Sequence, residues 1–127
     1  MQKRKIYKTK YFTRWARKVG LDDSLLAGAV IEIENGLLDA DLGGGIVKKR
    51  IALRDRGKRG STRTLIATNC DDRWFFVFGF EKNERDNISE SEITALKTLA
   101  KDLLGLTTFQ IQEAIDQGTL VEVAYEK

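Results

Sequence analysis

The sequence predicts an α+β fold in which helices pack on an antiparallel sheet, in the order strand, two helices and three-strand meander. Three strand-like runs, 47–53, 63–69 and 73–80, follow one another with short connections, and consecutive strands of this kind pair antiparallel. Two segments on either side of them, 22–36 and 89–105, carry apolar residues at helical spacing. Helices segregated from strands in this way are typical of the α+β class.

The N-terminal part is expected to hold one strand and two helices. Residues 5–12 alternate in the manner of a strand, and a short helical segment over 13–18 follows, which Gly20 ends. A second helix begins at a capping aspartate, Asp22 or Asp23. Its apolar residues form one stripe, which we expect to face the core.

The connection 37–45 is expected to be a loop, and it ends in three consecutive glycines. A phosphate-binding P-loop also requires a following Gly-Lys-Ser/Thr, which is absent here. The glycines therefore indicate either a flexible connection or a close approach of another segment to the backbone.

The C-terminal part shows two helix starts. Ser89 and Glu92 form an S-x-x-E capping box before the last long helix. A second box, Thr107 and Gln110, begins a shorter helix, and a last strand is expected over 120–125.

The composition indicates one domain with a core and a polar surface. The chain has 127 residues, of which 42% are hydrophobic and 32% are charged. It has no run of about 20 apolar residues for a membrane helix, and no apolar segment of a secretory signal follows the charged start. Its one cysteine, Cys70, cannot form an internal disulfide, which suits a reducing cytosol. We therefore expect a cytoplasmic location, no contact with a membrane, no metal and no cofactor.

The positive charge is concentrated in two segments. The net charge is only +3, but residues 3–18 and residues 48–63 each hold eight cations, which together are sixteen of the 22 lysines and arginines. From residue 86 to the end the acids outnumber the cations. The simplest interpretation of these clusters is a polar surface that contacts only solvent. The clustering favours instead a basic surface that meets a polyanion.

Cations also share one face of the predicted strand 47–53. Because side chains alternate along a strand, Lys48, Arg50 and Arg54 are expected on one face, with Lys49 on the other, mostly core side. Like charges on one face repel one another, so an anion is their natural partner. Four more cations follow in the next loop and strand: Arg56, Lys58, Arg59 and Arg63. In an antiparallel pair these side chains can converge on one groove.

The strand 73–80 carries five aromatic residues in seven positions. Most are expected in the core, because a central strand buries both faces. An alternative for Phe80 or Trp74 is an open ring on which an RNA base stacks. Lys82 and Arg85 follow the strand, beside the expected groove; Arg85 alternatively only pairs with a carboxylate of its own segment.

Together these features resemble the RelE/ParE superfamily of toxins from type II toxin–antitoxin systems, and most of all its HigB-like branch. The resemblance rests on the basic second strand, an arginine shortly after a glycine in the third strand, and an aromatic fourth strand running into Lys-Asn-Glu-Arg. It covers residues 5–105 and implies a microbial-ribonuclease-type fold. We accordingly expect a RelE-like domain over 1–106, with 107–127 as a helix and strand extension of the same domain.

The resemblance implies a ribosome-dependent endoribonuclease that cleaves mRNA without a metal and so inhibits translation. Its implied partners are the ribosome, mRNA and a cognate antitoxin, expected to be a helix-turn-helix protein. A ribose 2′-OH would attack the adjacent phosphorus, and clustered cations would stabilise the negative charge of the transition state. A lysine whose pKa neighbouring cations lower can take the proton in such a reaction.

The resemblance also implies roles for individual residues. Lys48 and Arg50 match the basic second-strand positions, with Lys48 as base or phosphate ligand, and Arg63 matches the arginine that contacts the scissile phosphate. Lys82 and Arg85 match basic positions after the fourth strand. The residues expected to bind RNA around this catalytic set are Arg54, Arg56, Lys58, Arg59 and Phe80.

Two positions depart from the family pattern. Asn83 stands where several members carry a catalytic arginine, and Ser89 stands roughly where some carry a tyrosine. ParE-like relatives lack most catalytic residues and inhibit DNA gyrase, so a non-enzymatic gyrase inhibitor is one alternative. A non-catalytic RNA-binding module is another. The density of Lys48, Arg50 and Arg63 favours the ribonuclease.

Overall fold

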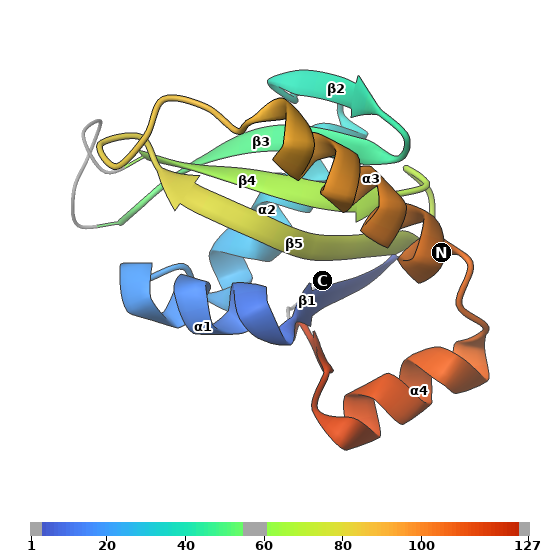
Figure 1. Cartoon of the computed structure of the whole chain (residues 1–127). Helices are drawn as coiled ribbons and strands as arrows, with labels where there is room; N and C mark the ends of the chain where they lie inside the picture. Colours follow the sequence, from blue (N-terminus) through green and yellow to red (C-terminus); the bar gives the residue numbers. More distant parts are fainter. Residues whose placement is uncertain (1–3, 55–60, 125–127) are drawn as a thin grey trace.

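The computed structural model of the protein describes residues 4–54 and 61–124. Figure 1 shows the helices on both sides of one sheet, with α2 behind it and α3 in front. The elements are, in chain order, β1 (Lys5–Thr9), α1 (Lys10–Val19), α2 (Asp23–Glu34), β2 (Ala40–Gly43), β3 (Ile46–Ala52), β4 (Ser61–Thr68), β5 (Arg73–Glu81), α3 (Glu90–Leu104), α4 (Thr108–Gln117) and β6 (Leu120–Glu122). The α+β class predicted from the sequence is confirmed.

The described strands form one mixed sheet in the order β2-β3-β4-β5-β1-β6. The meander of β3, β4 and β5 is antiparallel, as predicted. β1, however, runs parallel to β5, because the chain returns beside β1 in the same direction after two helices and the meander. The expectation of an entirely antiparallel sheet was therefore wrong at this one pairing. β6 pairs antiparallel with β1, so the C-terminal segment adds a strand to the same sheet.

Local capping explains where the structure departs from the predicted boundaries. The first strand ends at Thr9, not at Phe12, because Thr9 Oγ1 accepts a hydrogen bond from the Phe12 amide at 3.1 Å and caps α1. The predicted loop 37–45 contains the short strand β2. Asp22 caps α2 as predicted, accepting from the Leu25 amide at 2.9 Å. Both predicted capping boxes, at the starts of α3 and α4, are present.

Each face of the sheet has its own apolar core. On the α2 face, the predicted helical stripe packs on the strands, with Leu26, Val30 and Ile33 buried. On the other face, α3 and α4 cover the sheet. The aromatic strand β5 contributes to both, since Trp74 belongs to the α2 side and Phe75 to the α3 side. This confirms that β5 is a central strand buried on both faces.

A β-bulge in β5 changes which aromatic rings face α3. Leu65 pairs with Phe78, but the next residue, Ile66, pairs with Phe76, so β5 has one extra residue at this point. Beyond the bulge, Phe78 and Phe80 lie in the core on the α3 side. Strict alternation would have placed both with Phe76 on the α2 side. The bulge thus delivers two aromatic rings to the face that carries the cations.

The three consecutive glycines form the tight turn between β2 and β3. Gly43, Gly44 and Gly45 have φ angles of 81°, 61° and 84°, a region that favours glycine. A Cβ on Gly44 would lie 2.8 Å from Cγ of Lys97, which α3 places over the turn. Of the two predicted explanations, close approach to the backbone is therefore the one that holds.

Gly79→Ala is expected to destabilise the fold by about 1–3 kcal/mol through overpacking. A Cβ at Gly79 would lie 2.2 Å from the ring of Trp15, because α1 packs against β5 where the pairing with β1 has ended. Gly28→Ala in α2 is the matched control: apart from its chain neighbours and the backbone of its own helix, no atom lies within 4 Å of its Cβ position, and alanine should stabilise the helix by up to about 1 kcal/mol. Urea unfolding of both variants checks this, and a Gly79→Ala protein as stable as the wild type would contradict it.

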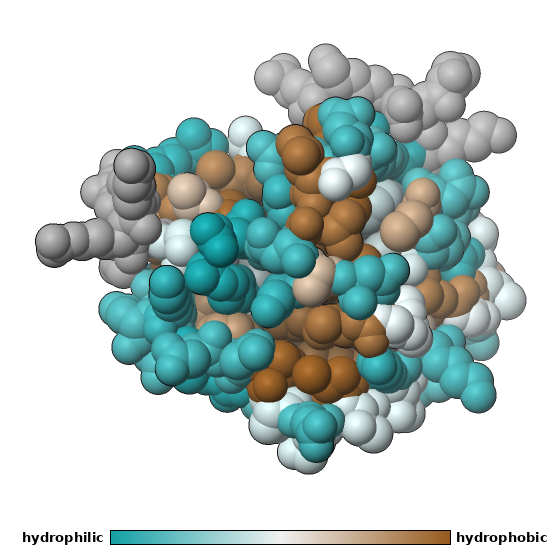
Figure 2. Space-filling model, turned by 90° about the horizontal axis from the view of Figure 1, so that it is seen from above, coloured by the Kyte–Doolittle hydropathy of each residue, from teal (hydrophilic) through white to brown (hydrophobic). Residues whose placement is uncertain are grey.

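The surface seen from the β2 edge of the sheet is mainly hydrophilic. Figure 2 shows a narrow band of hydrophobic side chains there, bordered by hydrophilic ones. The edge strand β2 has only four residues, which limits the unpaired backbone that it offers to another chain. None of the helices in the described part of the chain has the length and apolar character needed to cross a membrane.

Candidate active site

The α3 side of the sheet brings together three of the predicted site residues, Lys48, Arg50 and Arg63, which we call the cationic face. Arg50 pairs directly with Arg63 across β3 and β4, and Lys48 pairs with Leu65 of the core on this side. Side chains opposed in this way have Cβ atoms about 5 Å apart. As Figure 1 shows, α3 crosses the sheet but does not extend over the end where β3 finishes and β4 begins, to which Arg50 and Arg63 belong.

Within the described residues, ion pairs do not neutralise the charges of the cationic face. Within residues 4–54 and 61–124, no carboxylate forms an ion pair with Lys48, Arg50 or Arg63. Arg63 is half-buried, and its Nη1 donates a hydrogen bond to Ser61 Oγ at 3.0 Å. Directly opposed like charges destabilise a sheet. An anion bound between the two arginines would remove this repulsion, and a guanidinium can bind phosphate oxygens in a bidentate manner.

Lys49, the neighbour of Lys48, has a different environment. It is buried on the opposite face, as predicted, where its Nζ lies 2.8 Å from a Glu32 carboxylate oxygen and donates to the Leu37 carbonyl at 2.8 Å. Its charge is thus compensated inside the fold. The period-two alternation of β3 separates a structural lysine from a candidate site lysine.

Arg54 does not lie with the other cations, which corrects the prediction that it shares their face. Its guanidinium instead bonds both carboxylate oxygens of Asp22, at 3.1 and 3.2 Å, at the start of α2. β3 ends at Ala52, so strand alternation no longer applies at residue 54. The hydrogen bonds from Arg54 and from the Leu25 amide lower the pKa of Asp22. The other predicted loop cations, Arg56, Lys58 and Arg59, lie outside the described residues.

The two aromatic rings that were predicted as alternatives for base stacking are not exposed to solvent. Phe80 is only 3% exposed and Trp74 is fully buried, with its Nε1 donating to the Asp71 carbonyl at 3.2 Å. Among the described residues of this site, the exposed ring is that of Tyr11, which stacks on Phe78 and lies in the segment 5–12 that was predicted to be a strand. Thr9, two residues before Tyr11, caps α1 and makes it start earlier than predicted. This threonine is the sequence signal from which Tyr11 could have been assigned to the helix.

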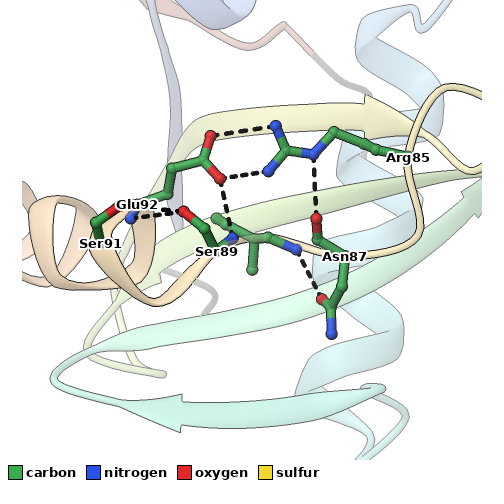
Figure 3. A network of polar contacts seen from close by, with 6 residues as sticks. Arg85, Asn87, Ser89, Ser91 and Glu92 are labelled. Carbon is green, nitrogen blue, oxygen red and sulfur yellow. Dashed lines mark hydrogen bonds and ion pairs between the residues drawn. The ribbon is translucent and has the colours of Figure 1, made fainter.

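Arg85 follows the end of β5 and takes part in a network of polar contacts (Figure 3). Its guanidinium carbon lies 5.8 Å from the centroid of the Phe78 ring and 5.3 Å from that of Phe80, within the range of cation–π attraction. Its two terminal nitrogens donate to the two carboxylate oxygens of Glu92, and its Nε donates to the Asn87 carbonyl at 3.1 Å. Arg85 therefore pairs with a carboxylate of α3, not with one of its own segment.

A family model for the RelE toxin of the RelE/RelB toxin–antitoxin system matches residues 4–123. The chain belongs to the RelE toxin family. The toxin is thus part of a toxin–antitoxin system and has a cognate antitoxin as partner. The match includes α4 and β6, which lie beyond the 5–105 segment on which the resemblance rested. No curated protein matches the chain, and assignment to the HigB-like branch stays a prediction.

The structure shows where the two residues that depart from the family pattern lie in the RelE toxin. Ser89 is the N-cap of α3: its amide donates to Glu92 Oε1 at 2.9 Å, and its Oγ accepts from the Glu92 amide at 3.2 Å. Asn83 and Lys82 are both exposed in the turn that follows β5. Glu92 joins these elements, since it completes the capping box and also holds Arg85.

No group of three or more His, Cys, Asp or Glu side chains in the described part of the toxin is arranged to hold a metal ion. What the site offers is a set of cations on a partly covered sheet face. Their chemistry is the binding of an anion and the stabilisation of negative charge that develops in a reaction.

Glu92→Gln is expected to change how the stability of the toxin depends on acid. Hydrogen bonds from Arg85 and then from Ser89 lower the pKa of Glu92 from 4.5 to about 2. Because the folded-state pKa is lowered, this stabilisation is present above pH 4.5 and is lost as the pH falls toward about 2. Glutamine keeps the capping box but cannot titrate. The wild-type advantage over Glu92→Gln should therefore grow from pH 2 to 4.5 and then level off.

Urea unfolding midpoints of both proteins between pH 2 and 7 measure this difference. Glu113→Gln, which changes an exposed carboxylate on α4, is the control and should follow the wild-type profile. Parallel pH profiles for the wild type and Glu92→Gln would show that the Arg85–Glu92 pair is not formed in solution.

Proposed function

We propose that this toxin is a ribosome-dependent endoribonuclease that cleaves mRNA, without a metal, and thereby inhibits translation in the cytoplasm. The observation that carries the proposal is the direct opposition of Arg50 and Arg63, which have no carboxylate partner among the described residues. The sheet alone gains nothing from this pair. A bound phosphodiester accounts for it, and membership of the RelE toxin family supports RNA as its source.

The proposed reaction is the attack of a ribose 2′-oxygen on the adjacent phosphorus, with departure of the 5′-oxygen of the next nucleotide. The non-bridging oxygens gain negative charge in the transition state, and we assign Arg50 and Arg63, which pair across β3 and β4, to bind them. Arg63 is half-buried, and charges act more strongly where water is partly excluded. These two residues therefore carry the electrostatic part of the reaction.

Proton transfer requires a base at the 2′-hydroxyl and an acid at the leaving oxygen. Lys48 lies one alternation from Arg50 on the same face of β3, and we assign it as base or as a further phosphate ligand. Lys82 and Arg85 stand on the other side of β4, after β5. Glu92 already pairs with Arg85, so we assign Lys82, which is exposed in the turn, to the leaving group.

A reconstituted translation reaction tests the proposal. With purified toxin and translating ribosomes, we expect mRNA to be cut at defined positions that primer extension maps. A 2′-deoxy nucleotide on the 5′ side of the cut should block it, because the attacking oxygen is then absent. Intact mRNA in a reaction whose translation has stopped would overturn the proposal. Supercoiling defects in place of cleavage would instead support a ParE-like inhibitor of gyrase.

The same proposal extends to the surrounding residues and the partner. Arg56, Lys58 and Arg59 are proposed to bind the RNA backbone. The antitoxin is proposed to be a helix-turn-helix protein, and the reading frame next to that of the toxin is the place to look for it.

A further inference from the structure

Tyr11 is a large aromatic residue that remains exposed beside the cationic face. It lies in the first turn of α1, and 59% of its surface is open to solvent. Its ring stacks on Phe78, with centroids 5.9 Å apart and an angle of 3° between the planes. The tyrosine ring is thus backed by a core residue, and its exposed surface is large enough to receive a flat partner.

The register of the sheet connects this ring to the cations. Phe78, under Tyr11, pairs with Leu65, which in turn pairs with Lys48 on β3. Adjacent strands are about 4.8 Å apart, so Tyr11 lies only a few strand spacings from the cationic face. The guanidinium of Arg85 also lies over the Phe78 ring. A nucleic acid bound at the cationic face would pass close to Tyr11.

The surroundings of Tyr11 favour a polyanion over a protein partner. Four exposed cations follow the helical spacing along α1: Lys10, Arg14, Arg17 and Lys18. Within the described residues, none of them forms an ion pair with a carboxylate. An aromatic ring set among unpaired cations is the combination that binds single-stranded nucleic acid, because bases stack on the ring while cations bind phosphates.

We propose that Tyr11 is a stacking platform for a nucleobase that flanks the phosphate held by Arg50 and Arg63. This deepens the proposed function and rests on it. The stacked pair with Phe78 fixes the ring before RNA arrives, and the Thr9 cap fixes the turn of helix that carries it. Because every base has a π-face, such a platform positions the strand with little dependence on sequence.

Binding of a nuclease-resistant 2′-O-methyl oligoribonucleotide at low salt, followed by fluorescence anisotropy, tests this proposal. Tyr11→Phe keeps the ring, whereas Tyr11→Leu keeps apolar bulk against Phe78 without a π-face. Phe109→Leu is the matched control, since Phe109 on α4 is 71% exposed but belongs to a helix away from β3, β4 and β5. A parallel set of oligonucleotides has one abasic position each.

For the wild type and for Tyr11→Phe, one abasic position should weaken binding by roughly 5- to 150-fold, the range for loss of one stacked base. Tyr11→Leu should bind the intact strand correspondingly less tightly and lose its sensitivity to that position. Phe109→Leu should bind like the wild type. In the wild-type protein, 2-aminopurine at the sensitive position should lose fluorescence on binding, because a stacked base is quenched.

Several results would overturn the inference. If Tyr11→Leu binds like the wild type while Arg63→Ala binds less tightly, the platform is wrong but the proposed function stands. Tyr11 does not stack on a base if Tyr11→Leu lowers the affinity for every abasic strand by the same factor relative to the wild type. The same conclusion follows if 2-aminopurine keeps its fluorescence at every position on binding. If the wild type fails to bind the strand at low salt, the platform is wrong, whereas the proposed function is decided by mRNA cleavage in the reconstituted translation reaction.

Discussion

Arg63→Ala is expected to abolish the toxicity of the protein while leaving it folded. Removing one preorganised donor to a developing anion typically lowers a reaction rate by about 10²- to 10³-fold, and Arg63 is the half-buried member of the opposed arginine pair. Growth after induction in cells, together with mRNA cleavage in reconstituted translation, measures the loss. Lys101→Ala, which removes an exposed cation from the last turn of α3, is the control and should stay toxic.

The same substitution should not reduce stability, which separates it from a folding defect. Truncating Arg63 relieves the repulsion with Arg50 and loses, among the hydrogen bonds of the described residues, the one to Ser61. A change between neutral and about 1 kcal/mol of stabilisation is expected from a cross-strand pair. A toxic Arg63→Ala protein would remove Arg63 from the active site, and a strongly destabilised one would show that the cationic face has a structural role.

Arg50→Glu is expected to have the second large effect, loss of activity together with increased stability. The new carboxylate would stand directly opposite Arg63 and form a cross-strand ion pair in the place that we assign to the phosphate. Replacing like charges by opposite charges at such a position should add about 1 kcal/mol to the free energy of unfolding. Urea unfolding and mRNA cleavage measure the two changes, and RNA binding should fall with cleavage.

Arg50→Gln is the matched control, because glutamine removes the repulsion but provides no anion. Its stability should lie between those of the wild type and Arg50→Glu, and part of its activity should remain, since Arg63 is still available. A stability for Arg50→Glu no higher than for Arg50→Gln would mean that residues 50 and 63 do not meet in solution. Full activity in either variant would mean that phosphate is bound elsewhere.

Much of the fold follows from local signals in the sequence. The α+β class, the capping boxes of α3 and α4 and the Asp22 cap all depend on residues close together in the chain, and all three are confirmed. The separation of Lys48 from Lys49 follows from the alternation of one strand. These features were predictable because each has a period or spacing that a short segment contains.

The clustering of cations on β3 and β4 was also predictable from the sequence, but the arrangement of their side chains depends on the tertiary structure. The opposition of Arg50 and Arg63 depends on strand register, and the turn of Phe78 toward α3 depends on a bulge; both arise between segments that pair across the sheet. Arg54 does not join these cations because it donates to Asp22, the N-cap of α2, which is distant in the sequence. The candidate site therefore depends on pairing between segments that are distant in the sequence, and a short segment does not contain this information.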